Sequence, residues 1–215
     1  MTYTVYGAAG SGSVPVEAAL TLIGAPFRVI EAVTWANDAE RDKVAAVNPM
    51  RQIPVLVTPG GEILTESAAI LVWLAEQHPE AALGPAPGDP LRGQFLRWMS
   101  FVSASIYSMF WVRDVPDRLV GDDPAAQATL KRRTADRIAD CWAMMEGQIE
   151  PGRFLLGDAL TVLDLYVATT SRWTPRRDRF HQIAPRMGEV VRRVDALPAL
   201  RAFWTERFPS APTPV

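Results

Sequence analysis

Hydrophobic periodicity changes once along this chain of 215 residues, at a segment rich in proline and glycine. Before that segment, short apolar runs with strand-like alternation separate stretches with helical spacing. After it, every periodic stretch has helical spacing, and no strand pattern is found. A chain of this length can form one large domain or two small ones. The change in periodicity therefore predicts two domains of different structural class.

The residues before the break alternate between strand-like and helical patterns. Gly24 ends the first helical run, as a glycine at a helix C-terminus does, and Asn48-Pro49 ends the second. The turn Pro59-Gly60-Gly61 joins two strand-like runs into a hairpin. The resulting order, β-α-β-α-β-β-α, is typical of the α/β class. The elements are expected within residues 3–7, 16–25, 27–33, 37–49, 53–58, 62–64 and 65–79, in that order.

The break itself predicts a linker between the two domains. Residues 78–90 contain four prolines and two glycines, a composition that favours loops and linkers. We place the first domain at residues 1–78, the linker at 79–90 and an all-helical domain at 91–215. Helical spacing in the second domain covers residues 91–112, about 123–150, 161–173 and 186–207.

Composition excludes several classes of function. The net charge of −2 argues against a nucleic-acid or anionic-membrane partner. With the single cysteine Cys141 and only two histidines, the chain lacks a disulfide framework and a histidine metal site. No apolar run approaches the ~20 residues that span a bilayer, and the N-terminus does not resemble a signal peptide. We expect a soluble, cytoplasmic protein.

Two serines stand where the first strand leads into the first helix, in the stretch "GAAGSGSVPVE" at residues 7–17. Ser13 is a suitable N-cap, because Pro15 in the first turn loses no hydrogen bond there. Ser11 is flanked by Gly10 and Gly12, which would let the backbone approach a ligand closely. A serine here is therefore either a cap or a group that holds a ligand at a helix N-terminus.

Three motifs in order carry a family resemblance. "QIPVL" opens the third strand, "TESAAI" opens the last helix of the first domain, and "FLLGDALTVLDLYVATTSRW" occupies residues 154–173. Together with the element order, they resemble the cytosolic glutathione S-transferases, of a bacterial serine-type or beta-like kind, from Tyr3 to about Phe208. The resemblance implies an α/β thioredoxin-like N-terminal domain followed by an all-α C-terminal domain.

The resemblance implies a glutathione site in the first domain. The Ile53–Pro54 peptide bond is implied to be cis, with Gln52 and the main chain of Ile53 beside the cysteinyl part of glutathione. Glu66 and Ser67 are implied to hold the γ-glutamyl group, whose carboxylate suits a helix N-terminus. The simpler interpretations are that Pro54 starts an edge strand and that Thr65 and Ser67 cap a helix.

The resemblance also bears on the serines. The catalytic position of bacterial members that carry serine or cysteine after the first strand aligns best with Ser11. We therefore predict Ser11 as the hydroxyl that stabilises the glutathione thiolate, and Ser13 as the cap. A shift of two residues would exchange these roles. Tyr6, at the end of the strand, is a weaker alternative and is expected to be packed.

The second domain supplies the remaining candidates. An aromatic stripe at residues 97–114 is typical of a helix core, but Tyr107 aligns with a pocket-lining position of bacterial relatives. Tyr107 and Trp111 are therefore candidates for the co-substrate pocket. Thr161, with Asp164 three residues later, predicts a variant capping box with a structural role.

The predicted function is that of a homodimeric glutathione S-transferase in detoxification. Glutathione would be the co-substrate, its thiolate would attack a small hydrophobic electrophile, and no metal would take part. One alternative is a non-catalytic binding or scaffold protein of the same fold. Another is a glutathione-dependent isomerase, peroxidase or dehalogenase.

Overall fold

The computed structural model describes residues 2–173 and 177–209. They form two compact units. One comprises the residues up to Ala86 together with those from Arg193 onward, and the other comprises Pro87–Arg192. The chain passes from the first unit to the second within the expected linker. Periodicity predicted that everything after residue 90 belongs to the second domain, whereas the structure groups the C-terminal segment with the first. Residues 210–215 lie outside the described part.

A four-stranded sheet forms the centre of the first unit. Its strands are β1 (Tyr3–Gly7), β2 (Phe27–Glu31), β3 (Val55–Val57) and β4 (Ile63–Thr65), in the spatial order β2-β1-β3-β4. β1 runs parallel to β2 and antiparallel to β3, and β3 and β4 form the expected hairpin. The strand pattern of the sequence is thus confirmed.

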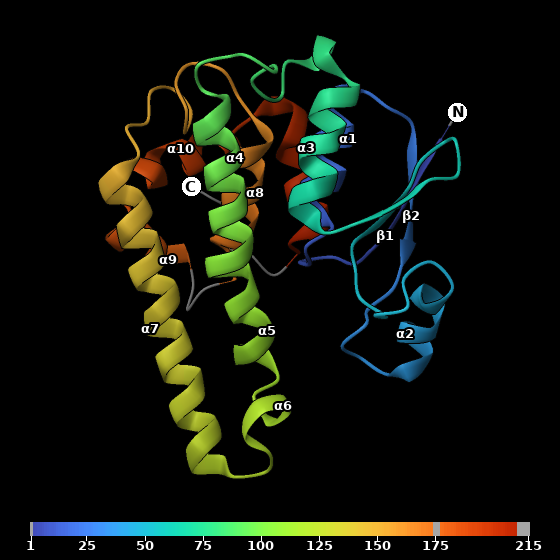
Figure 1. The fold of residues 1–215 in the computed structure, drawn as a ribbon, viewed down its shortest axis with the longest axis vertical. Helices are drawn as coiled ribbons and strands as arrows, with labels where there is room; N and C mark the ends of the chain where they lie inside the picture. The colour runs from blue at the N-terminus through green and yellow to red at the C-terminus, as the bar shows by residue number, and fades with distance from the viewer. Residues whose placement is uncertain (1, 174–176, 210–215) are drawn as a thin grey trace. The chain divides into compact units, whose positions relative to one another are not determined.

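Three helices accompany the sheet: α1 (Val14–Ile23), α2 (Asp38–Ala45) and α3 (Ser67–Gln77). α1 packs against α3, as Figure 1 shows. α1 ends at Gly24, which has a φ of 73°, a left-handed conformation that glycine adopts without steric cost. Successive strand residues face opposite sides of a sheet. Val55 accordingly packs with Val44 of α2, and its neighbour Leu56 is buried in the core on the other side.

The C-terminal segment completes the first unit. It contains the short 3₁₀ turn η3 (Pro198–Leu200), which packs against α1, and the helix α11 (Arg201–Arg207). Trp204 is buried, and its indole N–H donates to the carbonyl of Val194. The main-chain carbonyl of Arg207 accepts a hydrogen bond from the N–H of Gly10, at an N···O distance of 2.8 Å. The last helix is therefore tied to the loop that follows β1.

The second unit is helical. Apart from an isolated bridge between Phe154 and Gly157, its described residues contain no β-structure. α5 lies beside α7 (Figure 1). A π-helical segment, η2, interrupts the path from α4 to α5, where sequence periodicity predicted one continuous helix. The elements are α4 (Arg92–Phe101), η2 (Val102–Tyr107), α5 (Ser108–Asp114), α6 (Asp117–Val120), α7 (Pro124–Gln148), α8 (Val162–Thr170), α9 (Arg177–Ile183) and the start of α10 (Pro185–Asp195).

The combination of a thioredoxin-like α/β unit and a helical unit confirms the expected fold class. Within residues 2–173 and 177–209, no helix has the length and apolar character needed to cross a lipid bilayer. The same residues contain no group of three or more histidine, cysteine or acidic side chains placed to bind a metal ion.

Candidate functional site

Strand register brings the three predicted glutathione-site segments to one edge of the sheet. Tyr6 of β1 lies opposite Val55 of β3, and Val55 lies opposite Thr65 of β4. The loop carrying the two serines leaves the sheet just after Tyr6. Pro54 immediately precedes Val55, and Glu66 immediately follows Thr65. Residues separated by more than 50 positions in the sequence therefore meet at the same end of three neighbouring strands.

The loop after β1 places the two serine hydroxyls in contact. The Oγ atoms of Ser11 and Ser13 are 3.0 Å apart. The N–H of Ser13 donates to the Oγ of Ser11 at 3.1 Å. The N–H of Ala8 is shared between the two hydroxyls, at 3.3 Å from Ser11 and 3.2 Å from Ser13. Ser11 is 7% exposed, whereas Ser13 is fully buried.

Ser13 occupies the N-cap position of α1, but its side chain caps nothing. The prediction of a side-chain cap is therefore wrong. The hydroxyl instead donates to the Oε1 of Glu17, at 2.6 Å. Close packing explains this choice, because a Cβ atom at Gly7 would lie only 2.2 Å from the Ser13 Oγ. The absence of a side chain at Gly7 lets Ser13 turn inward, where a carboxylate competes for its proton.

Glu17 and Arg207 form a buried ion pair that sequence analysis missed. The Arg207 Nε lies 2.8 Å from the Glu17 Oε2, and the Arg207 Nη2 donates to the Glu17 Oε1 at 3.0 Å. Arg207 also donates through Nη1 to the Oε1 of Glu31, at 2.6 Å. The side chains of Arg207 and Glu17 are only 7% and 2% exposed. A signal was present, since Glu17 interrupts an otherwise apolar helical run, but no local pattern indicated its partner.

Burial and pairing act in opposite directions on these ionisable groups. Burial raises the pKa of Glu17, because the charged carboxylate loses its water. The hydrogen bond from Ser13 and the charge of Arg207 oppose that rise without cancelling it. For Arg207, burial lowers the pKa, but the hydrogen bond to Glu31 and the charge of Glu17 outweigh burial, and the pKa is raised. Arg207 is therefore a permanent cation, and Glu17 is a carboxylate with increased proton affinity.

Tyr6, the alternative thiolate partner, is packed as expected. It is half-buried against the cluster formed by Ala32, Val44 and Val55. Ile53 packs against the same cluster, and the Ile53–Pro54 peptide bond is cis, as the resemblance implied.

The main chain of Ile53 is available for pairing. Neither its N–H nor its C=O takes part in a hydrogen bond within the part of the chain that the structure describes. The neighbouring residue Gln52 is exposed, and its carbonyl accepts a hydrogen bond from the side-chain amide of Asn48, at 2.9 Å. Asn48 therefore fixes the segment that leads to Ile53.

The N-cap of α3 is Glu66, one residue after the predicted cap Thr65. Thr65 is the last residue of β4, so it continues the strand pairing with Val55 and does not cap the helix. Glu66 takes the N-cap position without a side-chain hydrogen bond, and its φ of 67° and ψ of 106° are unusual for a residue with a side chain. Such a backbone costs on the order of 1–3 kcal/mol and is concentrated at ligand clamps. Ser67, the first residue of α3, is 6% exposed.

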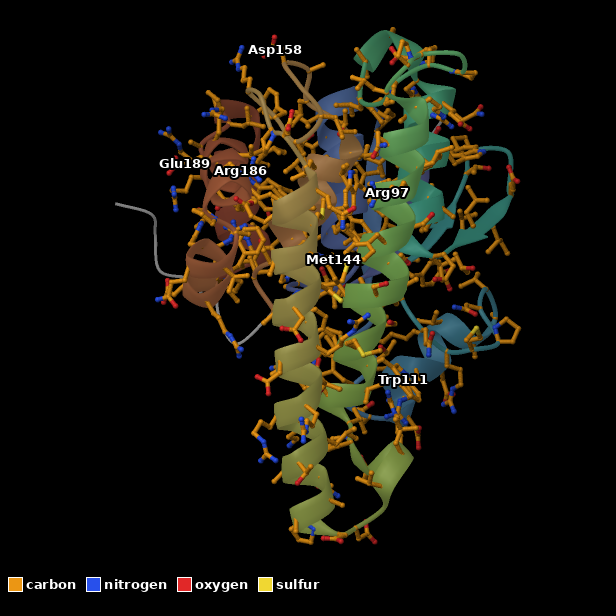
Figure 2. All side chains as sticks on the ribbon, turned by 60° about the vertical axis from the view of Figure 1, so that its left-hand side comes forward. Arg97, Trp111, Met144, Asp158, Arg186 and Glu189 are labelled. Carbon is orange, nitrogen blue, oxygen red and sulfur yellow. The ribbon has the colours of Figure 1, made fainter. Side chains whose placement is uncertain are left out.

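The two predicted pocket residues have different surroundings within the second unit. Tyr107 ends η2, is half-buried, and its ring centroid lies 5.0 Å from that of Trp173 and 6.2 Å from that of Tyr166. Trp111 is 44% exposed on α5 (Figure 2). The guanidinium carbon of Arg118 lies 4.6 Å from the centre of the Trp111 ring. Tyr107 thus belongs to an aromatic cluster, and Trp111 presents a cation-covered ring to solvent.

The predicted capping box at α8 is confirmed. The N–H and the hydroxyl of Thr161 donate to one carboxylate oxygen of Asp164, at 2.8 and 2.9 Å, and the N–H of Leu155 donates to the other, at 2.8 Å. Asp164 is fully buried, and the loss of water on burial raises its pKa from 3.8 to about 6, in spite of these bonds. The motif has a structural role.

Comparison with known proteins gives consistent matches. The model of the glutathione S-transferase N-terminal domain matches residues 11–77, and that of the C-terminal domain matches residues 127–209. The uncharacterized GST-like protein YncG of Escherichia coli (strain K12) is 29% identical over 198 residues, covering 92% of this chain and 94% of that protein. A maleylpyruvate isomerase of Ralstonia sp is 29% identical over 152 residues, covering 69% and 71%.

A solved structure has the same fold. The glutathione transferase homolog from Sulfitobacter, with bound glutathione, superposes with a TM-score of 0.83 over 95% of this chain and 98% of that chain. The sequence identity is 21%.

Proposed function

Because the chain belongs to the glutathione S-transferase family, we propose that it binds glutathione at the sheet edge of the first unit and transfers it to a small hydrophobic electrophile. The observation that carries this proposal is the register that aligns Tyr6, Val55 and Thr65. With this register, a hydroxyl, an unpaired main-chain segment and a helix N-terminus follow or precede neighbouring strands at the same end of the sheet. Each of the three suits a different part of glutathione, which is a tripeptide with a thiol.

The γ-glutamyl group binds at the start of α3. A helix N-terminus carries unpaired N–H groups and the positive end of the helix dipole, so it attracts a carboxylate. No side chain caps α3, which leaves these N–H groups to the ligand, and the Ser67 hydroxyl adds a further donor. The carboxylate of Glu66 is exposed and binds the ligand's ammonium group.

The cysteinyl part binds along Gln52 and Ile53. The free N–H and C=O of Ile53 pair with the peptide as one strand pairs with another. The thiol then lies beside Ser11. A thiol with a pKa near 8.5 is only a few per cent ionised at neutral pH, so an enzyme that stabilises the thiolate increases the reactive fraction.

The co-substrate and the biological setting complete the proposal. Tyr107 and Trp111 are the candidates for contact with the electrophile, because aromatic side chains bind apolar groups well. We further propose that the protein works as a homodimer in the cytoplasm and that its role is detoxification.

A second candidate function is a glutathione-dependent isomerisation. It is favoured by one observation, the 29% identity to a maleylpyruvate isomerase over 69% of this chain. Both reactions require the same thiolate, so the proposed site is common to them. Assays with alkyl and aryl electrophiles, and with a cis-configured diacid such as maleylpyruvate, separate the two.

Calorimetric titration with glutathione near neutral pH tests the proposal. We expect micromolar to low-millimolar binding that weakens sharply in Ser67→Ala. Ser100→Ala, which changes an exposed serine of α4, serves as the matched control and should bind as the wild type does. Absence of binding up to about 10 mM would mean a binding free energy weaker than roughly −2.7 kcal/mol. That result would favour the non-catalytic scaffold.

A further inference from the structure

The hydrogen bonds at Ser13 can be assigned a direction. A serine hydroxyl has one hydrogen, and an ionised carboxylate can only accept. At 2.6 Å, the contact between the Ser13 Oγ and the Glu17 Oε1 is the shortest that either serine makes, so the Ser13 hydrogen points to Glu17. The Ser13 Oγ is then an acceptor in its 3.0 Å contact with Ser11, and the hydrogen of Ser11 points to Ser13.

This order leaves one acceptor position of the Ser11 oxygen to a ligand. Its hydrogen is directed inward to Ser13, and the N–H of Ser13 takes one of the two acceptor positions of its oxygen, at 3.1 Å. The N–H of Ala8 lies 3.3 Å from the Ser11 Oγ and 3.2 Å from the Ser13 Oγ, so Ser13 can take this hydrogen bond when a ligand donates to Ser11. A ligand that meets Ser11 in this state finds an oxygen that is ready to receive a proton, at the head of a chain of hydrogen bonds that ends at a carboxylate.

Glu17 is suited to the end of such a chain. Among the described residues, the charged groups that face it are Arg207 from α11 and, beyond Arg207, Glu31 from β2. Burial raises the pKa of Glu17 above its ordinary value, so the carboxylate binds a proton more readily than one in water does. When Glu17 is neutral, Arg207 retains Glu31 as a charged partner 2.6 Å away.

We propose that Ser11, Ser13 and Glu17 form a proton relay that takes up the thiol proton of bound glutathione. The relay rests on the proposed function. The S–H bond breaks and its proton bonds to the Ser11 Oγ, the former Ser11 proton bonds to the Ser13 Oγ, and the former Ser13 proton bonds to the Glu17 Oε1. Three protons move by one place, and the negative charge moves from Glu17 to the sulfur.

The product of the relay is a stabilised thiolate. After the transfer, the hydrogen on Ser11 points outward and donates to the sulfur, so the same hydroxyl first accepts the proton and then stabilises the anion. Glu17 acts through Ser13 and is a positioning residue and proton store, without contact to the substrate. The complex keeps the proton that a simple hydroxyl donor would leave to solvent.

The fate of that proton is measurable with the full-length chain. Calorimetric titration with glutathione near neutral pH, in two buffers with different ionisation enthalpies, counts the protons released on binding. Ultraviolet absorbance of the thiolate, in the same samples, counts the thiolate formed. For the wild type we expect thiolate to form while far fewer protons than about one per thiolate are released to the buffer. For Glu17→Gln we expect less thiolate and about one proton released for each thiolate formed.

A second variant and a control distinguish loss of the relay from a general loss of folded structure. Ser13→Ala cuts the relay but keeps the ion pair between Glu17 and Arg207, so it should release protons as Glu17→Gln does, even if the latter folds poorly. Glu31→Gln removes the other carboxylate on Arg207 without touching Ser13 and should retain the wild-type proton count.

Two results would overturn the relay while leaving glutathione binding intact. One is a wild-type release of about one proton per thiolate, and the other is a Ser13→Ala variant whose proton count equals that of the wild type. A wild-type chain that binds no glutathione would overturn both the relay and the proposed function.

Discussion

Ser11 and Ser13 stand two residues apart with their hydroxyls in contact, yet their surroundings give them different chemistry. Ser13 is fully buried and directs its proton to Glu17. Ser11 retains a small exposed fraction. A ligand at the sheet edge can therefore meet Ser11 directly, whereas Ser13 can affect it only through Ser11. This difference supports Ser11 as the thiolate partner.

We predict that Ser11→Ala raises the pKa of the bound glutathione thiol by about one to two units, with a fall in kcat/KM of roughly 10- to 100-fold near neutral pH. The dissociation constant of glutathione should change little, because the γ-glutamyl site is retained. Thiolate absorbance as a function of pH, together with steady-state kinetics on a model electrophile, measures both effects.

Tyr6→Phe is the matched control for that prediction. It removes the hydroxyl of the alternative residue while keeping the ring that packs against Val55. The thiol pKa should stay at the wild-type value. A larger effect from Tyr6→Phe than from Ser11→Ala would exchange the roles of the two residues.

At the scale of an element, the first turn of α8 carries the carboxylate of Asp164, which accepts hydrogen bonds from three donors. The pKa of Asp164 rises from 3.8 to about 6 in the folded state. Between these two pH values, Asp164 therefore keeps its proton in the folded protein and loses it in the unfolded chain. Its contribution to the unfolding free energy falls as the pH rises through that range. A shift of about two units corresponds to roughly 3 kcal/mol.

We predict that Asp164→Asn lowers the unfolding free energy at every pH, because an amide has one acceptor oxygen for donors that reach both carboxylate oxygens. The penalty should be larger near about pH 4.5 than near about pH 7, by roughly 2 kcal/mol. Urea unfolding of both proteins across this range measures the difference. A penalty that does not depend on pH would show that Asp164 is already ionised in the folded state at the acid end.

Elements with a strong local signal were predictable, and those decided by pairing were not. Gly24 marks the end of α1 in both the sequence and the structure. The start of α3 was misplaced by one residue, because Thr65 remains paired in β4, and strand pairing is not visible in local propensity. The π-helical turn at η2 was missed as well, since a single wide turn leaves the helical hydrophobic pattern almost unchanged.

At the scale of the whole chain, the first unit depends on residues far away in the sequence. Arg207 and Glu17 are separated by 190 positions and share a buried ion pair. Local motifs predicted the sheet, the hairpin and the site segments. The position of the last helix beside them was not predictable, because the residues around Arg207 do not identify its partner.

We predict that Arg207→Ala lowers the unfolding free energy by about 3–5 kcal/mol, since it leaves the Glu17 carboxylate buried without its cation. Urea unfolding measures the loss. Arg201→Ala, at an exposed position of the same helix, should be nearly neutral. The double variant Glu17→Gln/Arg207→Ala should recover part of the loss, and a double variant that is no more stable than Arg207→Ala would argue against the buried charge as the cause.

The hydrogen bond from the Gly10 N–H to the Arg207 carbonyl affects the order in which the protein acquires its structure on the ribosome. Domains usually fold in the order of synthesis, the N-terminal one first. Here the strands and helices of the first unit leave the ribosome long before α11 has been translated. Until Arg207 has left the ribosome, Glu17 therefore lacks the cation that pairs with it in the folded protein. The loop at the proposed glutathione site therefore receives contacts from a segment that lies 190 positions beyond Glu17, so translation of the N-terminal segment alone does not complete it.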